Sequence, residues 1–151
     1  MEDKAARAEA LFRQGYNCAQ AVLGAFAGEI GMRQQDAMRL ASSFGGGMGK
    51  LREVCGAASA MFMVLGMRLG YSDPDDVAAK NAHYTRINQA GRAFAQMHGS
   101  LLCRELLHLQ GPEADTTPSK RTEAYYQQRP CARIVRGAAA MTARYLEGEE
   151  K

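Results

Sequence analysis

The spacing of apolar and polar residues along the chain predicts helices throughout. From residue 74 to residue 98, apolar residues recur at spacings of seven, three and four positions, which is the period of an amphipathic helix. Residues 50–69 are instead apolar on nearly all sides, as expected for a helix at the centre of a bundle. Glycines, prolines and capping residues divide the rest of the chain. Together these signals predict helices at about residues 2–14, 17–28, 31–44, 50–69, 74–98, 100–107, 119–128 and 131–146.

The composition supports the same fold class. The chain has 26 alanines but only 5 valines and 3 isoleucines, so helix formers dominate and the β-branched residues typical of strands are scarce. With 151 residues, 46% of them hydrophobic, the chain has the size of one domain that can bury a core. We therefore expect a single all-α domain over residues 1–151, a compact bundle of seven to eight helices around the central apolar helix.

Charge and hydropathy limit the expected cellular location of the protein and the kinds of partner it is expected to bind. The longest uncharged apolar stretch, Val54–Met67, has 14 residues, whereas about 18 or more are needed to span a bilayer, so no membrane span is expected. The charged N-terminal segment lacks the apolar core and cleavage site of a secretory signal, and we expect a cytoplasmic protein. The 19 basic and 16 acidic residues are interspersed and form no nucleic-acid-binding motif, so nucleic acid is not an expected partner.

Four cysteines are the strongest candidates for chemistry. They are separated by 37, 48 and 28 residues, no two form a Cys-x-x-Cys motif, and each lies in a different predicted element. Spacing alone leaves two interpretations open. The thiols are either four unrelated buried residues or one shared site formed where separate helices converge. The four are Cys18, Cys55, Cys103 and Cys131.

Their positions relative to helix starts favour the shared site. Cys18 directly follows the expected cap Asn17, and Cys103 and Cys131 also fall in first turns. The position of Cys55 stays open, because its helix could begin at Lys50 or at the Cys55–Gly56 break. A helix N-terminus carries about half a positive charge and unpaired N–H groups, which stabilise a thiolate and lower its pKa. We therefore predict that the four cysteines converge in space.

A glycine-rich segment precedes Cys55. It ends in Gly-Lys but lacks the first and last residues that a phosphate-binding P-loop requires, because Phe44 and Leu51 occupy those positions. The segment is then either a plain connection or a loop whose backbone approaches the sulfurs and donates N–H groups to them, and we favour the second. The glycines assigned to cofactor binding are Gly45, Gly46, Gly47, Gly49 and Gly56.

The segment Phe44–Ala60 resembles the signature of the C_GCAxxG_C_C family of redox-active proteins. Gly15–Gln20 upstream and the later Cys103 and Cys131 belong to the same match, which covers about residues 5–146. The last glycine of the family motif is replaced here by Ala60. The resemblance implies a small redox protein with an unidentified redox partner and a functional link to a transporter. Whether the protein forms a homodimer is left open.

Three functions follow from the cysteines and the resemblance. In the leading one, Cys18, Cys55, Cys103 and Cys131 hold an iron-sulfur cluster of the 2Fe-2S type for electron transfer. In the second, the protein is a metal-free thiol–disulfide protein in which Cys55 is the attacking thiol of low pKa and Cys18 its partner. In the third, it is a non-catalytic, partner-binding helical domain with a structural zinc site or inert thiols. The sequence does not decide whether the protein is an enzyme.

Overall fold

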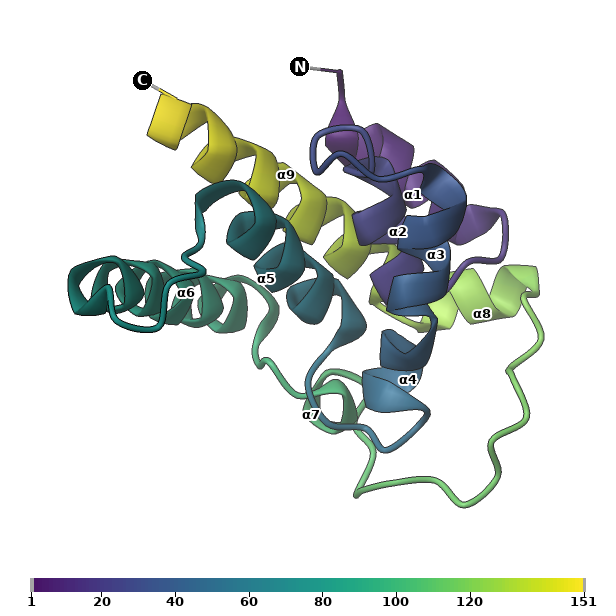
Figure 1. Ribbon diagram of the computed structural model, residues 1–151. Coiled ribbons are helices and arrows are strands. Elements are labelled where there is room, and N and C mark those ends of the chain that lie inside the picture. The colour runs from purple at the N-terminus through teal and green to yellow at the C-terminus, as the bar shows by residue number, and fades with distance from the viewer. Residues whose placement is uncertain (1, 151) are drawn as a thin grey trace.

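The computed structural model describes residues 2–150, with side chains through residue 148, so that residues 1 and 151 of the expected domain lie outside the description. The chain is all-α, as predicted, and the eight expected helices are joined by one further helical turn in the glycine-rich segment (Figure 1). The elements are α1 (Lys4–Arg13), α2 (Cys18–Ala25), α3 (Gln34–Ala41), the 3-10 turn η1 (Ser42–Phe44), α4 (Gly45–Met48), α5 (Gly56–Leu69), α6 (Val77–His98), α7 (Cys103–Leu106), α8 (Glu123–Gln128) and α9 (Cys131–Glu150). No helix in residues 2–150 is long and apolar enough to cross a membrane.

Side-chain caps explain where several helices begin. Asn17 forms a capping box at the start of α2, because its side chain accepts from the N–H of Gln20 while the Gln20 side chain accepts from the N–H of Asn17. The long helix α6 begins at residue 77 and not at 74 as expected. Its cap is Asp76, whose carboxylate accepts from the N–H of Ala79.

The core forms around α2 and α5. Helix α2 is buried along nearly its whole length and packs against α1, α3, α5 and α9. The predicted central helix α5 is buried at its N-terminal half and packs against α2, α9 and α6, while its far end emerges at Met67, which is 65% exposed. The small alanines of these helices allow close approach, and large side chains such as Phe26 and Phe94 fill the space between them.

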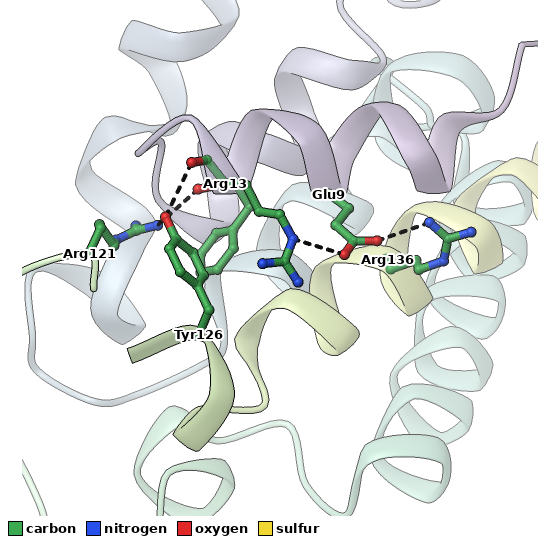
Figure 2. A network of polar contacts seen from close by, with 6 residues as sticks. Glu9, Arg13, Arg121, Tyr126 and Arg136 are labelled. Atoms are coloured by element: carbon green, nitrogen blue, oxygen red, sulfur yellow. Dashed lines mark hydrogen bonds and ion pairs between the residues drawn. The ribbon is translucent and has the colours of Figure 1, made fainter. Parts of the chain in front are cut away.

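Helices α1 and α9 lie side by side although they come from opposite ends of the chain (Figure 1). On their exposed side, the Glu9 carboxylate of α1 accepts from Arg13 at 3.1 Å and from Arg136 of α9 at 3.0 Å (Figure 2). Surface ion pairs of this kind stabilise a fold only slightly. The apolar contact between α1 and α9 therefore contributes more to their association than the ion pairs do.

The segment that leads to α5 differs most from the prediction. The apolar helix begins at Gly56, the later of its two expected starts, because residues 53–55 pair instead with residues 101–103. The N–H of Cys55 donates to the carbonyl of Leu101 at 2.8 Å, and the N–H of Cys103 donates to the carbonyl of Glu53 at 2.6 Å. These bonds hold the segments of two cysteines next to each other.

Helix α7 also begins later than expected, at residue 103 and not at 100. The Ser100 hydroxyl accepts from the N–H of Leu102 and bonds the Glu105 carboxylate, so it shapes the turn before the helix and caps no residue within it. This shift makes Cys103 the first residue of the helix.

Candidate functional site

The four cysteines converge on one pocket, as their first-turn positions predicted. The pocket has a volume of about 490 Å³, and all four cysteines line it as free thiols. Cys18, Cys103 and Cys131 are the first residues of α2, α7 and α9, and Cys55 is the residue immediately before α5. The site is therefore built where the starts of four helices meet.

Cys18 is surrounded by hydrogen-bond donors. Its sulfur accepts from the thiol of Cys55 and from the backbone N–H groups of Gly46, Ala19 and Gly56. The bond from Cys55 is the largest effect, and together the donors outweigh burial and lower the pKa of Cys18 to about 6. At neutral pH this sulfur is a thiolate, which is the reactive form of cysteine.

Cys55 has the opposite character. Its hydrogen bond to Cys18, its burial and the negative charge on Cys18 raise the pKa of Cys55 well above its usual value. The thiol therefore keeps its proton and donates it to the neighbouring sulfur. The sequence analysis expected the lower pKa at Cys55, whereas here the lower pKa of the pair belongs to Cys18, to which the backbone N–H groups of Gly46 and Gly56 also contribute.

Cys103 and Cys131 are held as neutral thiols. Burial raises the pKa of Cys103, although Arg52 donates to its sulfur at 3.4 Å. Burial and the negative charge on Cys18 raise the pKa of Cys131 to about 12. Of the four cysteines, Cys18 alone has a lowered pKa, so the pocket holds one thiolate among three thiols.

The glycine-rich segment lies directly against these sulfurs. A Cβ atom on Gly56 would be 2.8 Å from the sulfur of Cys18, and a Cβ on Gly47 would be 2.6 Å from the Cβ of Cys103. Both approaches require glycine. The expected approach of this segment to the sulfurs is seen at Gly47 and Gly56, and the backbone of Gly46 contributes to the lowered pKa of Cys18. Its role in binding a cofactor stays a prediction.

The same segment follows an unusual backbone path. Gly46 and Gly47 have φ of 64° and 61°, so α4 is not a regular right-handed helix, and the expected break at the glycines is confirmed. Non-glycine residues with positive φ follow at Met48, Lys50 and Arg52, each of which is disfavoured by about 1–2 kcal/mol. Such strain is maintained only where surrounding contacts enforce it.

Contacts of Arg52 help to hold this strained segment in place. The sequence analysis did not identify Arg52 as a residue of the site. Its side chain is 2% exposed, forms an ion pair with Glu113, and donates to the sulfur of Cys103. Lys50 adds bonds from its ammonium group to the carbonyls of Asp115 and Thr117, at 3.3 and 2.5 Å. The long segment between α7 and α8 is thereby attached to the glycine-rich segment. A cationic residue three positions before Cys55 was the available signal for this role.

Ala60 occupies the position of the last glycine in the family motif. The residue is completely buried within α5. The core therefore accommodates the methyl group of Ala60, which is the fifth residue of α5.

The thiols surround the pocket and do not converge on a single point. Within the part of the chain that the structure describes, no three or more His, Cys, Asp or Glu side chains are grouped so that they could hold a metal ion. A tetrahedral zinc site needs such a group, with zinc–sulfur bonds of about 2.3 Å. The arrangement as it stands does not fit a mononuclear zinc site.

Comparison with protein families gives one match. Residues 16–145 match the family described as "Putative redox-active protein (C_GCAxxG_C_C)". The matched range contains all four cysteines, the glycine-rich segment and most of the chain. Neither the curated proteins nor the solved structures include a match to this chain.

Proposed function

Since the chain belongs to the C_GCAxxG_C_C family of redox-active proteins, we propose that it exchanges thiols and disulfides through Cys18 and Cys55. The observation that carries the proposal is the placement of Cys18 and Cys55 in one pocket, where the Cys18 sulfur lies against Gly56, the residue after Cys55, and where the pKa of Cys18 is lowered and that of Cys55 is raised. An attacking thiolate beside a protonated thiol is the arrangement that thiol–disulfide exchange requires.

The reaction proceeds in two displacements. The Cys18 thiolate attacks one sulfur of a substrate disulfide, a mixed disulfide forms, and the first substrate thiolate leaves. The Cys55 sulfur then attacks Cys18, and the second substrate sulfur leaves with the proton of Cys55. The protein pair is oxidised to a disulfide, and the substrate disulfide is reduced to one thiolate and one thiol.

The order of these steps follows from the coupling between the two sulfurs. The hydrogen bond to Cys18 and the charge on Cys18 are among the causes that keep Cys55 protonated. When Cys18 enters a mixed disulfide its negative charge disappears, and both causes disappear with it. Cys55 is thus released for attack only after Cys18 has reacted.

The donors around Cys18 also favour the reduced state of the pair. Hydrogen bonds from Gly46 and Gly56 stabilise the Cys18 thiolate, which exists only when the pair is reduced. A stabilised reduced form makes the corresponding disulfide a stronger oxidant. The Cys18–Cys55 disulfide should therefore be reduced readily.

Oxidation followed by disulfide mapping tests the pair. Reduced protein is treated with one equivalent of a small disulfide, digested, and analysed by peptide mass. The proposal expects one intramolecular disulfide between Cys18 and Cys55, and the same disulfide in a Cys131→Ser variant. Oxidation that links other cysteines first, or that forms no intramolecular disulfide, contradicts it.

An iron-sulfur cluster of the 2Fe-2S type is the second candidate. It is favoured by the convergence of four thiols on one pocket and by the backbone donors at Cys18, since such clusters are held by four cysteine thiolates and tuned by N–H groups. Cys18, Cys55, Cys103 and Cys131 would be the ligands. When bound, the cluster would supply one-electron transfer. The donor set fits this group in chemistry, although the thiols are not grouped around an ion.

Iron and acid-labile sulfide analysis of protein purified without oxygen separates the two candidates. About two iron and two sulfide per chain support the cluster. Absence of both, with four titratable thiols, supports thiol exchange by Cys18 and Cys55. A chain with neither a cluster nor redox-active thiols would be the non-catalytic, partner-binding domain. The expected redox partner, transporter link and cytoplasmic location stay predictions.

A further inference from the structure

Apart from the Cys18 thiolate, the charged side chains that line the cysteine pocket are all cationic. Among the described residues that line it are four cationic side chains and no aspartate or glutamate. Arg52 is paired with Glu113. The other three are Lys50, Arg121 and Arg129, and none of them forms an ion pair with a described carboxylate. Lys50 is bonded to two carbonyls of the segment between α7 and α8, so Arg121 and Arg129 are the two that stand beside the aromatic side chains of the pocket.

Arg121 holds its charge in a fixed position at the wall of the pocket. Its guanidinium donates to the carbonyls of Phe12 at 2.9 Å and Tyr16 at 3.0 Å, and lies 4.4 Å from the centroid of the Phe12 ring. It also approaches the hydroxyl of Tyr126 (Figure 2). None of these partners carries a negative charge, and no described carboxylate forms an ion pair with Arg121.

Arg129 lines the pocket beside one of its aromatic rings. Its guanidinium is 4.9 Å from the centroid of the Tyr125 ring. No ion pair joins Arg129 to a carboxylate in the described part of the chain. Its charge is therefore left for a ligand that enters the pocket.

The rest of the pocket suits a small molecule. Its volume of about 490 Å³ lies within the usual range of ligand sites, and its lining includes the apolar side chains of Leu106, Leu107 and Ile134 beside the charges. Guanidinium groups bind carboxylates through charge-assisted hydrogen bonds. A negatively charged small molecule would thus be held with its carbon chain on the apolar side chains and its acidic group at Arg121 and Arg129.

We infer that the substrate of this pocket is a small disulfide that carries carboxylates, bound through Arg121 and Arg129 with its sulfur facing Cys18. The inference rests on the proposed thiol exchange. In the exchange the substrate disulfide is reduced, and the protein pair Cys18 and Cys55 is oxidised. A dithiol reductant then returns the pair to the reduced state. The cations also stabilise the negative charge on the first thiolate that leaves.

Three disulfides of similar size and different charge test the inference. They are dithiodiglycolate, which is anionic, bis(2-hydroxyethyl) disulfide, which is neutral, and cystamine, which is cationic. The rate of oxidation of the reduced protein by each is divided by the rate of a free thiol with the same disulfide at the same pH. We expect the normalised rate to be about 10-fold higher for the anionic than for the neutral disulfide, lowest for cystamine, and to converge at high salt.

A matched pair of charge variants locates the effect. Arg129→Gln is expected to reduce the preference for the anionic disulfide over the neutral one by several-fold. Arg144→Gln removes the same charge from an exposed position of α9 outside the pocket, next to Met97 and Met141, and is expected to keep the preference.

The outcomes separate the inference from the function on which it rests. Equal normalised rates for the three disulfides, a preference for cystamine, or identical behaviour of Arg129→Gln and Arg144→Gln would overturn the anionic substrate and leave thiol exchange standing. A reduced protein that reacts with none of the three would overturn thiol exchange itself.

Discussion

At the scale of single residues, the chemistry of the site depends on the donors around one sulfur atom. Cys18 and Cys55 are both cysteines at helix starts, yet their pKa values move in opposite directions. The difference arises because Cys18 accepts hydrogen bonds from Gly46 and Gly56 and from Cys55 itself, whereas Cys55 is the donor of the pair. Hydrogen bonds to the charged form lower a pKa, and burial beside a negative charge raises it.

The pH dependence of alkylation measures this difference. In the reduced protein, the rate at which iodoacetamide modifies Cys18 is expected to reach half its maximum near pH 6, because the thiolate is the reacting form and the pKa of Cys18 is about 6. Cys55→Ala removes the thiol donor and should move the midpoint to higher pH. The same midpoint in both proteins, or a midpoint near the usual value of free cysteine, would contradict the account.

The sequence could predict part of this chemistry. Asn17 and the first-turn position of Cys18 are visible in the sequence, and both lie where they were expected. The donors Gly46 and Cys55 are far away along the chain, so no local pattern could show which sulfur they would face. This is why the lower pKa was expected at the other member of the pair.

At the scale of elements, the helix starts and the glycine-rich segment position the thiols. The cap Asn17 holds the first turn of α2 through its bond from the N–H of Gln20, and its amide also donates to the carbonyl of Ser42. It therefore connects the helix of Cys18 to the segment that leads into the glycines.

Removing the cap should change both stability and reactivity. Asn17→Ala is expected to lower the free energy of unfolding by about 0.5–2 kcal/mol and to raise the pKa of Cys18, because the frayed turn loses its alignment with the sulfur. Urea denaturation and the alkylation profile measure the two effects. Asn81→Ala, at an exposed position within α6, serves as the control. If the two variants have the same Cys18 profile, the helix start contributes nothing to the thiolate.

Substitutions at two glycines that share nearly the same backbone conformation distinguish the cost of backbone strain from the cost of a steric clash. Gly47 and Gly49 have φ of 61° and 58°, but a Cβ on Gly47 would be 2.8 Å from the Cα of Arg52 while a Cβ on Gly49 would meet nothing within 4 Å. Either substitution by alanine should lower stability by about 1–2 kcal/mol through backbone strain. Gly47→Ala should lose more and should displace Cys103. Equal losses in urea denaturation would show that the segment serves only as a connector.

The helix boundaries show where local signals were sufficient. The start of α2 follows from its capping box, which is a pattern of neighbouring residues. The start of α5 was left open between residue 50 and the Cys55–Gly56 break, and the start of α7 was placed too early. Local signals were insufficient because these segments form backbone bonds across the chain, from Cys55 to Leu101 and from Cys103 to Glu53. Tertiary pairing of this kind overrides helix propensity and leaves no periodic signal.

At the scale of the whole molecule, the single thiolate couples stability to pH. Folding lowers the pKa of Cys18 from its usual value near 9 to about 6, so between these values the unfolded chain holds a proton that the folded chain has released. The free energy of unfolding then rises with pH from about 6 to about 8, and the gain is lost as pH falls toward 6. Above about pH 8 the three cysteines of raised pKa oppose the rise, because the unfolded chain begins to release protons that the folded chain keeps.

Urea denaturation of the reduced protein between pH 7 and about 8 tests this coupling. His83 and His98 have lowered pKa values and contribute mainly below that range. Stability should rise with pH in the parent protein and lose this dependence in Cys18→Ser. A parent protein whose stability falls with pH across the range would show that Cys18 is not a thiolate.

The general fold could be predicted from composition and periodicity. The set of cationic residues that line the cysteine pocket could not be predicted in this way. Abundant alanine and the period of the apolar residues indicated the helical bundle, and first-turn cysteines indicated their convergence. The cationic wall depends on contacts between distant segments, such as the bond from Arg121 to the carbonyl of Phe12. These contacts exist only once α1 and α9 have packed together.

The central claim is that Cys18 attacks and Cys55 resolves. Cys55→Ser, whose hydroxyl still donates to Cys18, and Cys18→Ser are each exposed to dithiodiglycolate at pH 7 and analysed by intact mass and peptide mapping. The account predicts a stable mixed disulfide on Cys18 in Cys55→Ser and no comparable adduct on Cys55 in Cys18→Ser. An adduct that forms on Cys55 as fast as on Cys18, or no adduct on Cys18, would contradict it.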